Sequence, residues 1–531
     1  MQAATPIPLQ RTSTLAPAAL LRTHLVLVMA LLATLPVWLC DLPLGADMPQ
    51  HAAQISLALD HFSSRHWGDD IQINVFTPYL LTYLVGAVIA KLLGVVTALK
   101  LLISLSLAGT VWATARLLDA WGQDRRLAIF SLLGLYGLSY QWGFLPFNLS
   151  VVLLLWLLAE VKSAQTGLPR LMLLALLLLL THGLTAAVAA LLLLVLTLVE
   201  PALTTRLRNY AVILTLLLPT LAWQAFATTG VKGFGTGIYF ATNLFHSPYF
   251  FYAELSSQSS HWVNGWGRLT GLFPRVLGLE NGTAATLAGL ALMLCPLLLG
   301  YRLHRQRPNQ ILGVTLLVIL FVMPSVINGS LYSAERFSLL VFCFLPLLLA
   351  PKTASNTLIA VISLAAISLI SVNCLRASDF NQRMSGLQNL IAGMPAQQHT
   401  LTLSYSYEGN GFIAPMMLHA GQWYGAQKNG LVDPSFATTD LQPIRYRAGK
   451  APYATIGNGF DWAPAAHPWS QFHDARHASY LVHGSVADFE AHTGCKVVGR
   501  QHSLGQWSTF QQSAIDTRTC KKNSLLKGSS S

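Results

Sequence analysis

A short acidic stretch after the first hydrophobic segment holds the residues best suited to chemistry. Asp41 and Asp47 lie in residues 41–51, which end at His51. Asp47 precedes His51 by four residues, so on a helix that begins near Pro49 the two side chains approach one face. A carboxylate there can act as a general base for a hydroxyl, while the imidazole can orient it, bind a phosphate or ligate a metal. The alternative is that Asp47 only caps the helix.

A second acidic pair, Asp69 and Asp70, follows in the same segment. Together with Asp47 and His51 it could ligate a divalent cation such as Mg²⁺ or Mn²⁺, because these ions prefer carboxylate oxygens. Adjacent acidic residues also occur in ordinary solvated turns. The sequence leaves both interpretations open.

Arg336 is the basic residue whose position most needs an explanation. It follows Tyr332 and opens a hydrophobic segment on the expected outer side, and a guanidinium can bind a phosphate through two hydrogen bonds. It could instead extend to the membrane interface or pair with Glu335. His182 and Asn148 stand at expected helix ends, where they could contact a substrate or simply form hydrogen bonds that end a helix.

The composition excludes an ordinary soluble domain. Of 531 residues, 53% are hydrophobic and 10% are charged, and the mean hydropathy is +0.50. Leu-rich runs with almost no charge favour helices in a bilayer, because a helix satisfies its own backbone hydrogen bonds there. The net charge of +12 comes from basic residues dispersed in short loops, which argues against nucleic-acid binding. We expect a polytopic α-helical membrane protein.

The hydrophobic runs predict about eleven transmembrane helices together with juxtamembrane helices. The first run, 25–40, follows Arg11 and Arg22 and could be a signal peptide, but no small-residue cleavage site follows it, so we expect an uncleaved helix. The later spans are expected near residues 98–118, 127–144, 148–161, 170–182, 184–199, 209–228, 284–301, 311–328, 336–350 and 353–372.

Basic residues in the short loops predict the orientation. If the N-terminus is cytoplasmic and 77–96 is a juxtamembrane or re-entrant helix, nearly every basic short loop falls inside. If 77–96 crossed the membrane, the cluster 302–307 would face outward. The favoured arrangement puts several polar features on one outer face, namely the loops 41–97 and 229–283 and the turns that contain Asn148, His182 and Arg336.

The C-terminal part changes character after the expected transmembrane domain, 1–375. Residues 376–531 hold no run of membrane length and are expected to form a soluble α/β or α+β domain outside the cytoplasm, with a disordered tail from about 521. Its patterns predict strands at 399–405, 478–483 and 506–510 and a helix at 414–426. Cys495 and Cys520 can form a disulfide in an oxidising compartment.

These features together resemble the GT-C superfamily of integral membrane glycosyltransferases. The resemblance is carried by a first helix, an outer loop with Gly45-Ala-Asp-Met-Pro-Gln-His51, the stretch Thr77-Pro-Tyr79, about eleven spans and a soluble C-terminal domain. Members of this superfamily take a sugar from a polyprenyl phosphate on the outer leaflet and transfer it with inversion. They use an acidic residue of the first outer loop.

The resemblance implies a role for two residues. Asp47 would be the catalytic base, and Arg336 would bind the phosphate of the leaving lipid. The acceptor would be a glycan, a glycolipid or a protein, and the expected location is a bacterial inner membrane with a cytoplasmic N-terminus. Met48 stands where several subfamilies carry a second acidic residue, and Asn148 stands where others have Asp, so metal dependence stays open.

Two other functions are compatible with the sequence. A transporter or flippase of a lipid-linked or small solute is one, although no internal repeat or matched pair of broken helices is evident. A non-catalytic scaffold for envelope assembly is the other. An Asp47→Asn substitution separates an enzyme from a scaffold, because only the enzyme needs this carboxylate for turnover.

Overall fold

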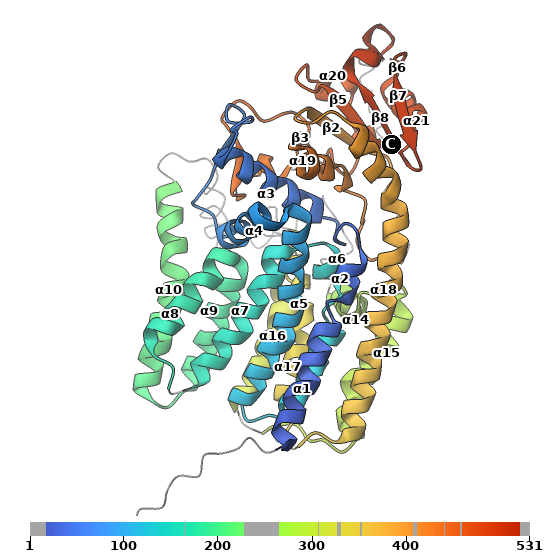
Figure 1. Ribbon diagram of the computed structural model, residues 1–531. Coiled ribbons are helices and arrows are strands. Elements are labelled where there is room, and N and C mark those ends of the chain that lie inside the picture. The colour runs from blue at the N-terminus through green and yellow to red at the C-terminus, as the bar shows by residue number, and fades with distance from the viewer. Residues whose placement is uncertain are drawn as a thin grey trace, which may run out of the picture.

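The computed structural model describes most of the chain as a helical bundle with a smaller, part-sheet domain at one end (Figure 1). The described residues are 17–163, 165–227, 265–305, 307–325, 331–350, 353–406, 411–439, 441–456 and 459–520. Most of the expected outer loop 229–283, and the tail from 521 that was expected to be disordered, lie outside these ranges.

Apolar helices form the bundle, as the hydrophobic runs predict. Three described helices are long and apolar enough to cross a membrane, namely α5 (Val95–Ala120), α7 (Leu145–Lys162) and α18 (Asn356–Gly393). A bent pair, Gly267–Leu277 with Gly282–Leu298, meets at 79° and could form a fourth span. The other bundle helices are α1 (Pro17–Leu32), α2 (Leu35–Leu39), α8 (Leu168–Thr181), α9 (Gly183–Leu198), α10 (Leu203–Ala227), α13 (Gly265–Thr270), α14 (Leu272–Leu277), α15 (Gly282–Leu298) and α16 (Arg307–Val322).

Two expected spans, 127–144 and 336–350, are not single helices. The first consists of η1 (Arg125–Leu133) and α6 (Leu138–Gln141), and the second of η2 (Glu335–Leu339), α17 (Leu340–Phe344) and η3 (Leu345–Leu348). Both are mostly buried in the core of the bundle. A Cβ atom on Gly137 would lie 2.3 Å from the carbonyl oxygen of Arg275. At this point the backbone of residue 137 lies too close to that of residue 275 for a regular helix with side chains on every face.

Residues 77–96 contain helix α4 (Leu80–Leu93), which has 14 residues and ends at Gly94 with a φ of +82°. At about 1.5 Å per residue it is roughly 21 Å long, shorter than a bilayer core of about 30 Å. It packs against α3 (Met48–Phe62) and α5 and lies towards the tail-domain end of the bundle (Figure 1). Helix α8, inside the expected span 170–182, also has 14 residues, so the length of α4 alone does not separate a juxtamembrane helix from a crossing one.

The tail domain begins after Gly393 rather than at Arg376, because α18 continues without a break past the expected boundary. Its five-stranded sheet has the order β3-β2-β5-β8-β7, with β2 parallel to β3 and β5, and β8 antiparallel to β5 and β7. The strands are β2 (His399–Ser404), β3 (Leu431–Asp433), β5 (Ser479–His483), β7 (Gln501–Leu504) and β8 (Trp507–Gln511). Three of them lie at the predicted positions.

The predicted helix 414–426 forms only in its last part. It consists of the short helices η4 (Ala420–Gln422) and α19 (Trp423–Lys428). The remaining short helices of the tail domain are η5 (Phe436–Thr438), η7 (Pro464–Ala466), α20 (Trp469–Phe472), α21 (Val486–Thr493), η8 (Gln512–Ala514) and η9 (Thr517–Thr519). The mixed sheet and these helices make the domain α+β in character.

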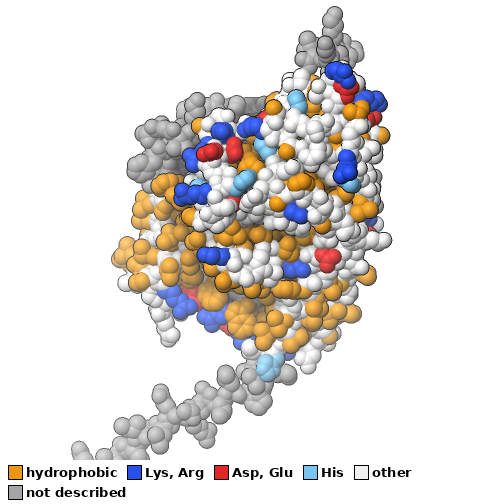
Figure 2. All heavy atoms as spheres, turned by 45° about the horizontal axis from the view of Figure 1, so that its top comes forward, with side chains coloured by type: hydrophobic (Ala, Val, Ile, Leu, Met, Phe, Trp, Pro, Cys, Tyr) orange, Lys and Arg blue, Asp and Glu red, His pale blue; other side chains and the backbone are white. Residues whose placement is uncertain are grey.

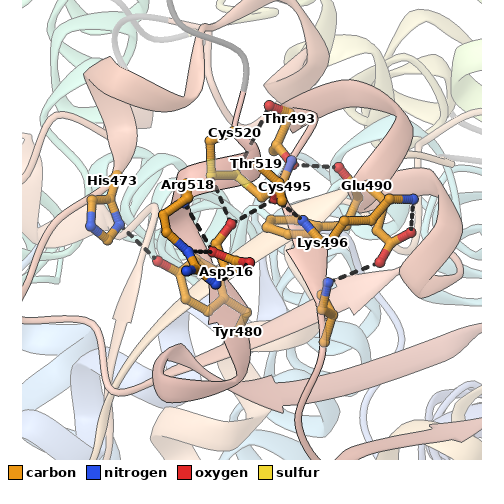
Figure 3. Close-up of a disulfide and its surroundings, with 12 residues drawn as sticks. His473, Tyr480, Glu490, Thr493, Cys495, Lys496, Asp516, Arg518, Thr519 and Cys520 are labelled. Atoms are coloured by element: carbon orange, nitrogen blue, oxygen red, sulfur yellow. Dashed lines mark hydrogen bonds and ion pairs between the residues drawn. A yellow bond between two sulfur atoms is a disulfide. The ribbon is translucent and has the colours of Figure 1, made fainter.

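The predicted disulfide between Cys495 and Cys520 is confirmed (Figure 3). It lies beside a two-stranded sheet formed by β6 (Lys496–Val497) and β9 (Ile515–Asp516). Polar contacts surround it, including an ion pair between Lys496 and Glu490 with a separation of 2.9 Å. The disulfide joins the segment after α21 to the last described residues of the chain.

The tail domain is joined to the segment between α2 and α4 through backbone and side chains. Strand β1 (Ile71–Ile73) pairs antiparallel with β4 (Ile444–Tyr446) of the tail domain. On α3, the Gln54 side chain donates to the carbonyl oxygen of Ile444 and accepts from its N–H. Helix α3 also packs against α19. The residues that follow Asp47 are therefore held by the tail domain.

The molecular surface separates into apolar and polar regions. Figure 2 shows hydrophobic side chains gathered over the bundle and many charged and His side chains over the tail domain. Exposed large hydrophobic residues occur on several bundle helices, for example Leu92 on α4, Leu298 on α15 and Leu364 on α18. Apolar surface of this extent is typical of contact with lipid.

Candidate functional site

Asp47 lies where two turns meet backbone to backbone. The N–H of Ala46 donates to the carbonyl oxygen of Gln141 at 3.0 Å, and the N–H of Asp47 donates to that of Trp142 at 2.9 Å. This approach needs glycine on both turns. Gly45 has a φ of +136°, and a Cβ atom on it would lie 2.9 Å from the Cα of Gly143. The turns thus fix the Asp47 backbone against the turn before α7.

The Asp47 side chain does not cap α3, although Asp47 occupies the position before its first residue, Met48. Its Oδ1 atom lies 2.9 Å from Nδ1 of His419, a tail-domain residue. The Asp47 residue is 8% exposed. The structure thus excludes the capping alternative and leaves a largely buried carboxylate paired with an imidazole.

His419 connects Asp47 to a second carboxylate. Its Nε2 atom lies 3.4 Å from Oδ2 of Asp461. Burial alone would lower the pKa of His419, but hydrogen bonds to Asp461 and Asp47 outweigh it and raise the pKa to about 9. At neutral pH the imidazole is therefore a cation held between two carboxylates.

His51 approaches the same place but uses both ring nitrogens. Its Nε2 atom lies 3.0 Å from the carbonyl oxygen of Gly143, and its Nδ1 lies 2.7 Å from the hydroxyl of Tyr83. A carbonyl can only accept, so Nε2 carries the proton when the ring is neutral, and Nδ1 is then an acceptor. The single proton of the Tyr83 hydroxyl is shared between this Nδ1 and Oε1 of Gln442, which lies 3.0 Å from the hydroxyl. Burial lowers the pKa of His51 to about 4, so it is neutral near pH 7. This geometry makes His51 a positioning residue of the turn.

Arg336, Tyr332 and His182 are brought together as one group. The guanidinium carbon of Arg336 lies 4.1 Å from the centre of the Phe144 ring. Its Nε donates to the carbonyl oxygen of Tyr332 at 3.3 Å, and its Nη1 lies 3.4 Å from Nε2 of His182. The Arg336 residue is 4% exposed, so it does not extend into solvent.

The contact between Arg336 and His182 has a specific chemical character. Nδ1 of His182 lies 3.2 Å from the backbone nitrogen of Thr185, where it caps α9, and 2.9 Å from the Thr185 hydroxyl. With its proton on Nδ1, a neutral ring donates to that hydroxyl and accepts at Nε2 from Arg336; with its proton on Nε2, it accepts from the Thr185 N–H. The Arg336 guanidinium is a donor in either case. An anion such as a phosphate oxygen placed here would accept from Arg336 and favour the tautomer of His182 that donates through Nε2.

Trp142 links the Asp47 group to the Arg336 group. Its carbonyl oxygen holds Asp47, and its ring lies 5.9 Å from that of Phe144 and 5.0 Å from that of Tyr332. On the tail-domain side its ring lies 5.7 Å from that of Trp462, the residue after Asp461. Both groups thus border one aromatic cluster.

Three expected residues lie outside this arrangement. Asn148 donates to the carbonyl oxygen of Ser139 at 3.1 Å, in the first turn of α7, and has a structural role. Asp69 is exposed, and Asp70 lies 3.8 Å from Nζ of Lys450, as in a solvated turn.

The expected metal ligands do not form a three-ligand cluster. Among the described residues, the one group of three whose ligand atoms lie within 4.8 Å of one another is His399, Asp433 and His477. All three belong to the tail domain. Asp47, His51, Asp69 and Asp70 are thus not gathered around one point.

His419 and Asp461 could not be found from the sequence. His419 is separated from Asp47 by 372 positions, and it fell within a predicted helix of a domain expected to be separate. No motif marks either residue, because only the docking of the tail domain brings them to the segment that holds Asp47.

The site therefore combines a largely buried carboxylate, a cationic imidazole and a nearby guanidinium on one end of the bundle. Such a set can accept a proton at one position and bind an anion at another. Comparison with protein-family models, with curated proteins and with solved structures finds no match for this chain.

Proposed function

We propose that this chain is a polytopic inner-membrane glycosyltransferase with about eleven spans. It would move a sugar from a polyprenyl-phosphate donor to an extracytoplasmic acceptor with inversion. One observation supports this most, namely that Asp47 and the Arg336 guanidinium, with its neighbour His182, border the same aromatic cluster. A base and an anion-binding group are the two features that such a transfer requires.

The reaction needs only a single displacement. A carboxylate oxygen of Asp47 takes the proton of the acceptor hydroxyl, and the hydroxyl oxygen forms a bond to the anomeric carbon. The bond between that carbon and the phosphate oxygen breaks, and its electron pair leaves with the phosphate. N–H groups of Arg336 and His182 stabilise the charge that develops there. Attack opposite the leaving group inverts the anomeric centre.

His419 and Asp461 act as positioning residues in this proposal. The hydrogen bond from Nδ1 of His419 holds Oδ1 of Asp47, so Oδ2 is the oxygen that can take the proton. Asp461 fixes the opposite side of the same ring. The tail domain thereby completes the catalytic group.

The proposal is tested by mass spectrometry of envelope glycans, glycolipids and glycoproteins from cells that lack the protein. Cells complemented with wild type should regain a defined sugar, and cells with Asp47→Asn should make it at least about 100-fold more slowly. Asp41→Asn is the matched control, because Asp41 is exposed in the same stretch. Protein levels are compared by immunoblot.

Other outcomes of this assay separate the alternatives. Full restoration by Asp47→Asn at equal protein level would remove the catalytic role and favour a scaffold. In proteoliposomes, movement of a lipid-linked or small solute across the membrane with no glycosylated product would identify a transporter or flippase. Dependence of product formation on Mg²⁺ or Mn²⁺ would reopen the question of a catalytic cation.

A further inference from the structure

Three buried side chains converge in the tail domain, apart from the Asp47 site. His399 begins β2, Asp433 ends β3, and His477 precedes β5. Strand β2 lies between β3 and β5 and is parallel to both, which brings the three residues together. His399 is 7% exposed, and Asp433 and His477 are 0% exposed.

The geometry centres on one carboxylate oxygen. Nε2 of His399 lies 2.6 Å from Oδ2 of Asp433, and Nε2 of His477 lies 3.1 Å from the same atom. The hydroxyl of Tyr446 donates to the other oxygen, Oδ1, at 2.6 Å. Two imidazoles and one carboxylate, with an outer hydrogen bond that orients the carboxylate, form a common set of metal ligands.

We propose that His399, Asp433 and His477 bind a Zn²⁺ ion. Two imidazole nitrogens favour zinc over Mg²⁺ and Ca²⁺, which take oxygen ligands. Ligands of a tetrahedral zinc ion at about 2.1 Å lie roughly 3.4 Å apart. The His477 contact is close to this spacing, and the His399 ring would have to withdraw by less than about 1 Å. A water or Oδ1 of Asp433 can complete the four ligands.

The charge of the cluster supports an ion. Asp433 is fully buried, and an ionised carboxylate in such a place is costly unless it is paired or bound to a metal. The positive charge of Zn²⁺ would balance it, and both imidazoles would be ligands. Without the ion, both rings must direct a proton to the same oxygen, which gives a purely hydrogen-bonded cluster.

The ion would be structural and would act on the neighbourhood of Asp47. Pro434 follows Asp433, and its carbonyl oxygen accepts from Nε2 of Gln50 at 2.9 Å and of Gln422 at 2.6 Å. Gln50 lies in the first turn of α3, next to His51. The zinc cluster therefore fixes the segment that holds α3 against the tail domain. This holds whether or not the chain transfers a sugar.

Metal analysis of the full chain tests the proposal. The protein is purified in detergent without a polyhistidine tag and analysed by inductively coupled plasma mass spectrometry. Wild type should carry about one zinc per chain. Asp433→Asn and His477→Gln should lose at least about 90% of it. His473→Gln, in the loop before His477, is the control and should keep it.

A second measurement keeps the test independent of variant folding. X-ray absorption of the wild-type protein should show a zinc shell of nitrogen and oxygen at about 2.0–2.1 Å with imidazole scattering. Wild-type protein without zinc, and with an unchanged thermal midpoint on addition of ZnSO₄, would overturn the proposal and leave a hydrogen-bonded cluster. Zinc retained by Asp433→Asn would also overturn it.

Discussion

His419 shows how strongly one side chain depends on its neighbours in this molecule. It faces Asp47 on one side and Asp461 on the other, and Phe436 packs against its ring. Burial opposes its positive charge, yet the two carboxylates keep it protonated, with a pKa of about 9. His51, also close, is neutral near pH 7 because burial lowers its pKa to about 4. The cation of this group is therefore His419.

The raised pKa of His419 predicts that stability falls as the pH rises. Its contribution is complete below the unfolded value of 6.5 and is lost as the pH passes through about 9. One pKa unit corresponds to about 1.4 kcal/mol, so the loss should reach about 3 kcal/mol. Thermal midpoints of the protein in detergent between pH 6 and pH 10 measure it.

Two variants make this experiment specific. His419→Asn should remove the part of the pH dependence that lies between 6.5 and 9. His492→Asn, an exposed histidine on α21, should keep the wild-type slope. Equal slopes for wild type and His419→Asn would mean that His419 is not the titrating group.

Individual site residues were only partly predictable. Asp47 and Arg336 could be singled out because charged residues beside apolar segments need a reason. The grouping of Arg336 and Tyr332 with His182 required the fold, because His182 is 154 positions away from Arg336 in the chain. His419 and Asp461 carry no motif, and Asn148 proved to be a hydrogen-bonding residue of α7.

At the scale of elements, α3 depends on the tail domain for its position. Gln50 is 0% exposed, and its Oε1 accepts from the N–H of Phe436 while its Nε2 donates to Pro434. Gln54 makes an equivalent pair of bonds to Ile444. A Gln side chain can satisfy a backbone donor and a backbone acceptor at once, as a strand neighbour does.

Loss of one such pair of hydrogen bonds should weaken the contact between α3 and the tail domain. Gln50→Ala leaves the partly buried N–H of Phe436 without its partner and should destabilise the docking by about 1–3 kcal/mol. Hydrogen exchange measured by mass spectrometry should become faster in β1 and β4. Gln382→Ala, at an exposed position of α18, is the control. Unchanged exchange in both strands would show that Gln50 does not stabilise the contact between α3 and the tail domain.

Helix prediction succeeded or failed according to backbone packing. The run 148–161 forms α7 because its Leu-rich sequence can place side chains all round. The runs 127–144 and 336–350 are equally apolar but contact other backbones closely, and they form short helical pieces in the core. Hydropathy measures affinity for an apolar environment and cannot distinguish a lipid-facing helix from a buried, irregular segment.

At the scale of the whole molecule, the pairing of β1 with β4 constrains the topology. It holds residues 71–73 and the tail domain together, so both must lie on the same side of a membrane. The number of crossings between them must then be even. Ten spans are expected after the first, which satisfies this condition, whereas a crossing by α4 would add one and violate it. A disulfide in the tail domain favours the oxidising, outer side.

This argument predicts which loops a membrane-impermeant maleimide can reach. Asp69→Cys lies exposed just before β1 and should be labelled in intact cells. Leu303→Cys lies exposed between α15 and α16, beside Arg302 and Arg305, and should be labelled only after the membrane is permeabilised. Neither substitution removes a basic residue that sets the orientation. Labelling of Leu303→Cys in intact cells would mean that α4 crosses the membrane, and the outer location of His182 and Arg336 would then be wrong, together with the catalytic proposal.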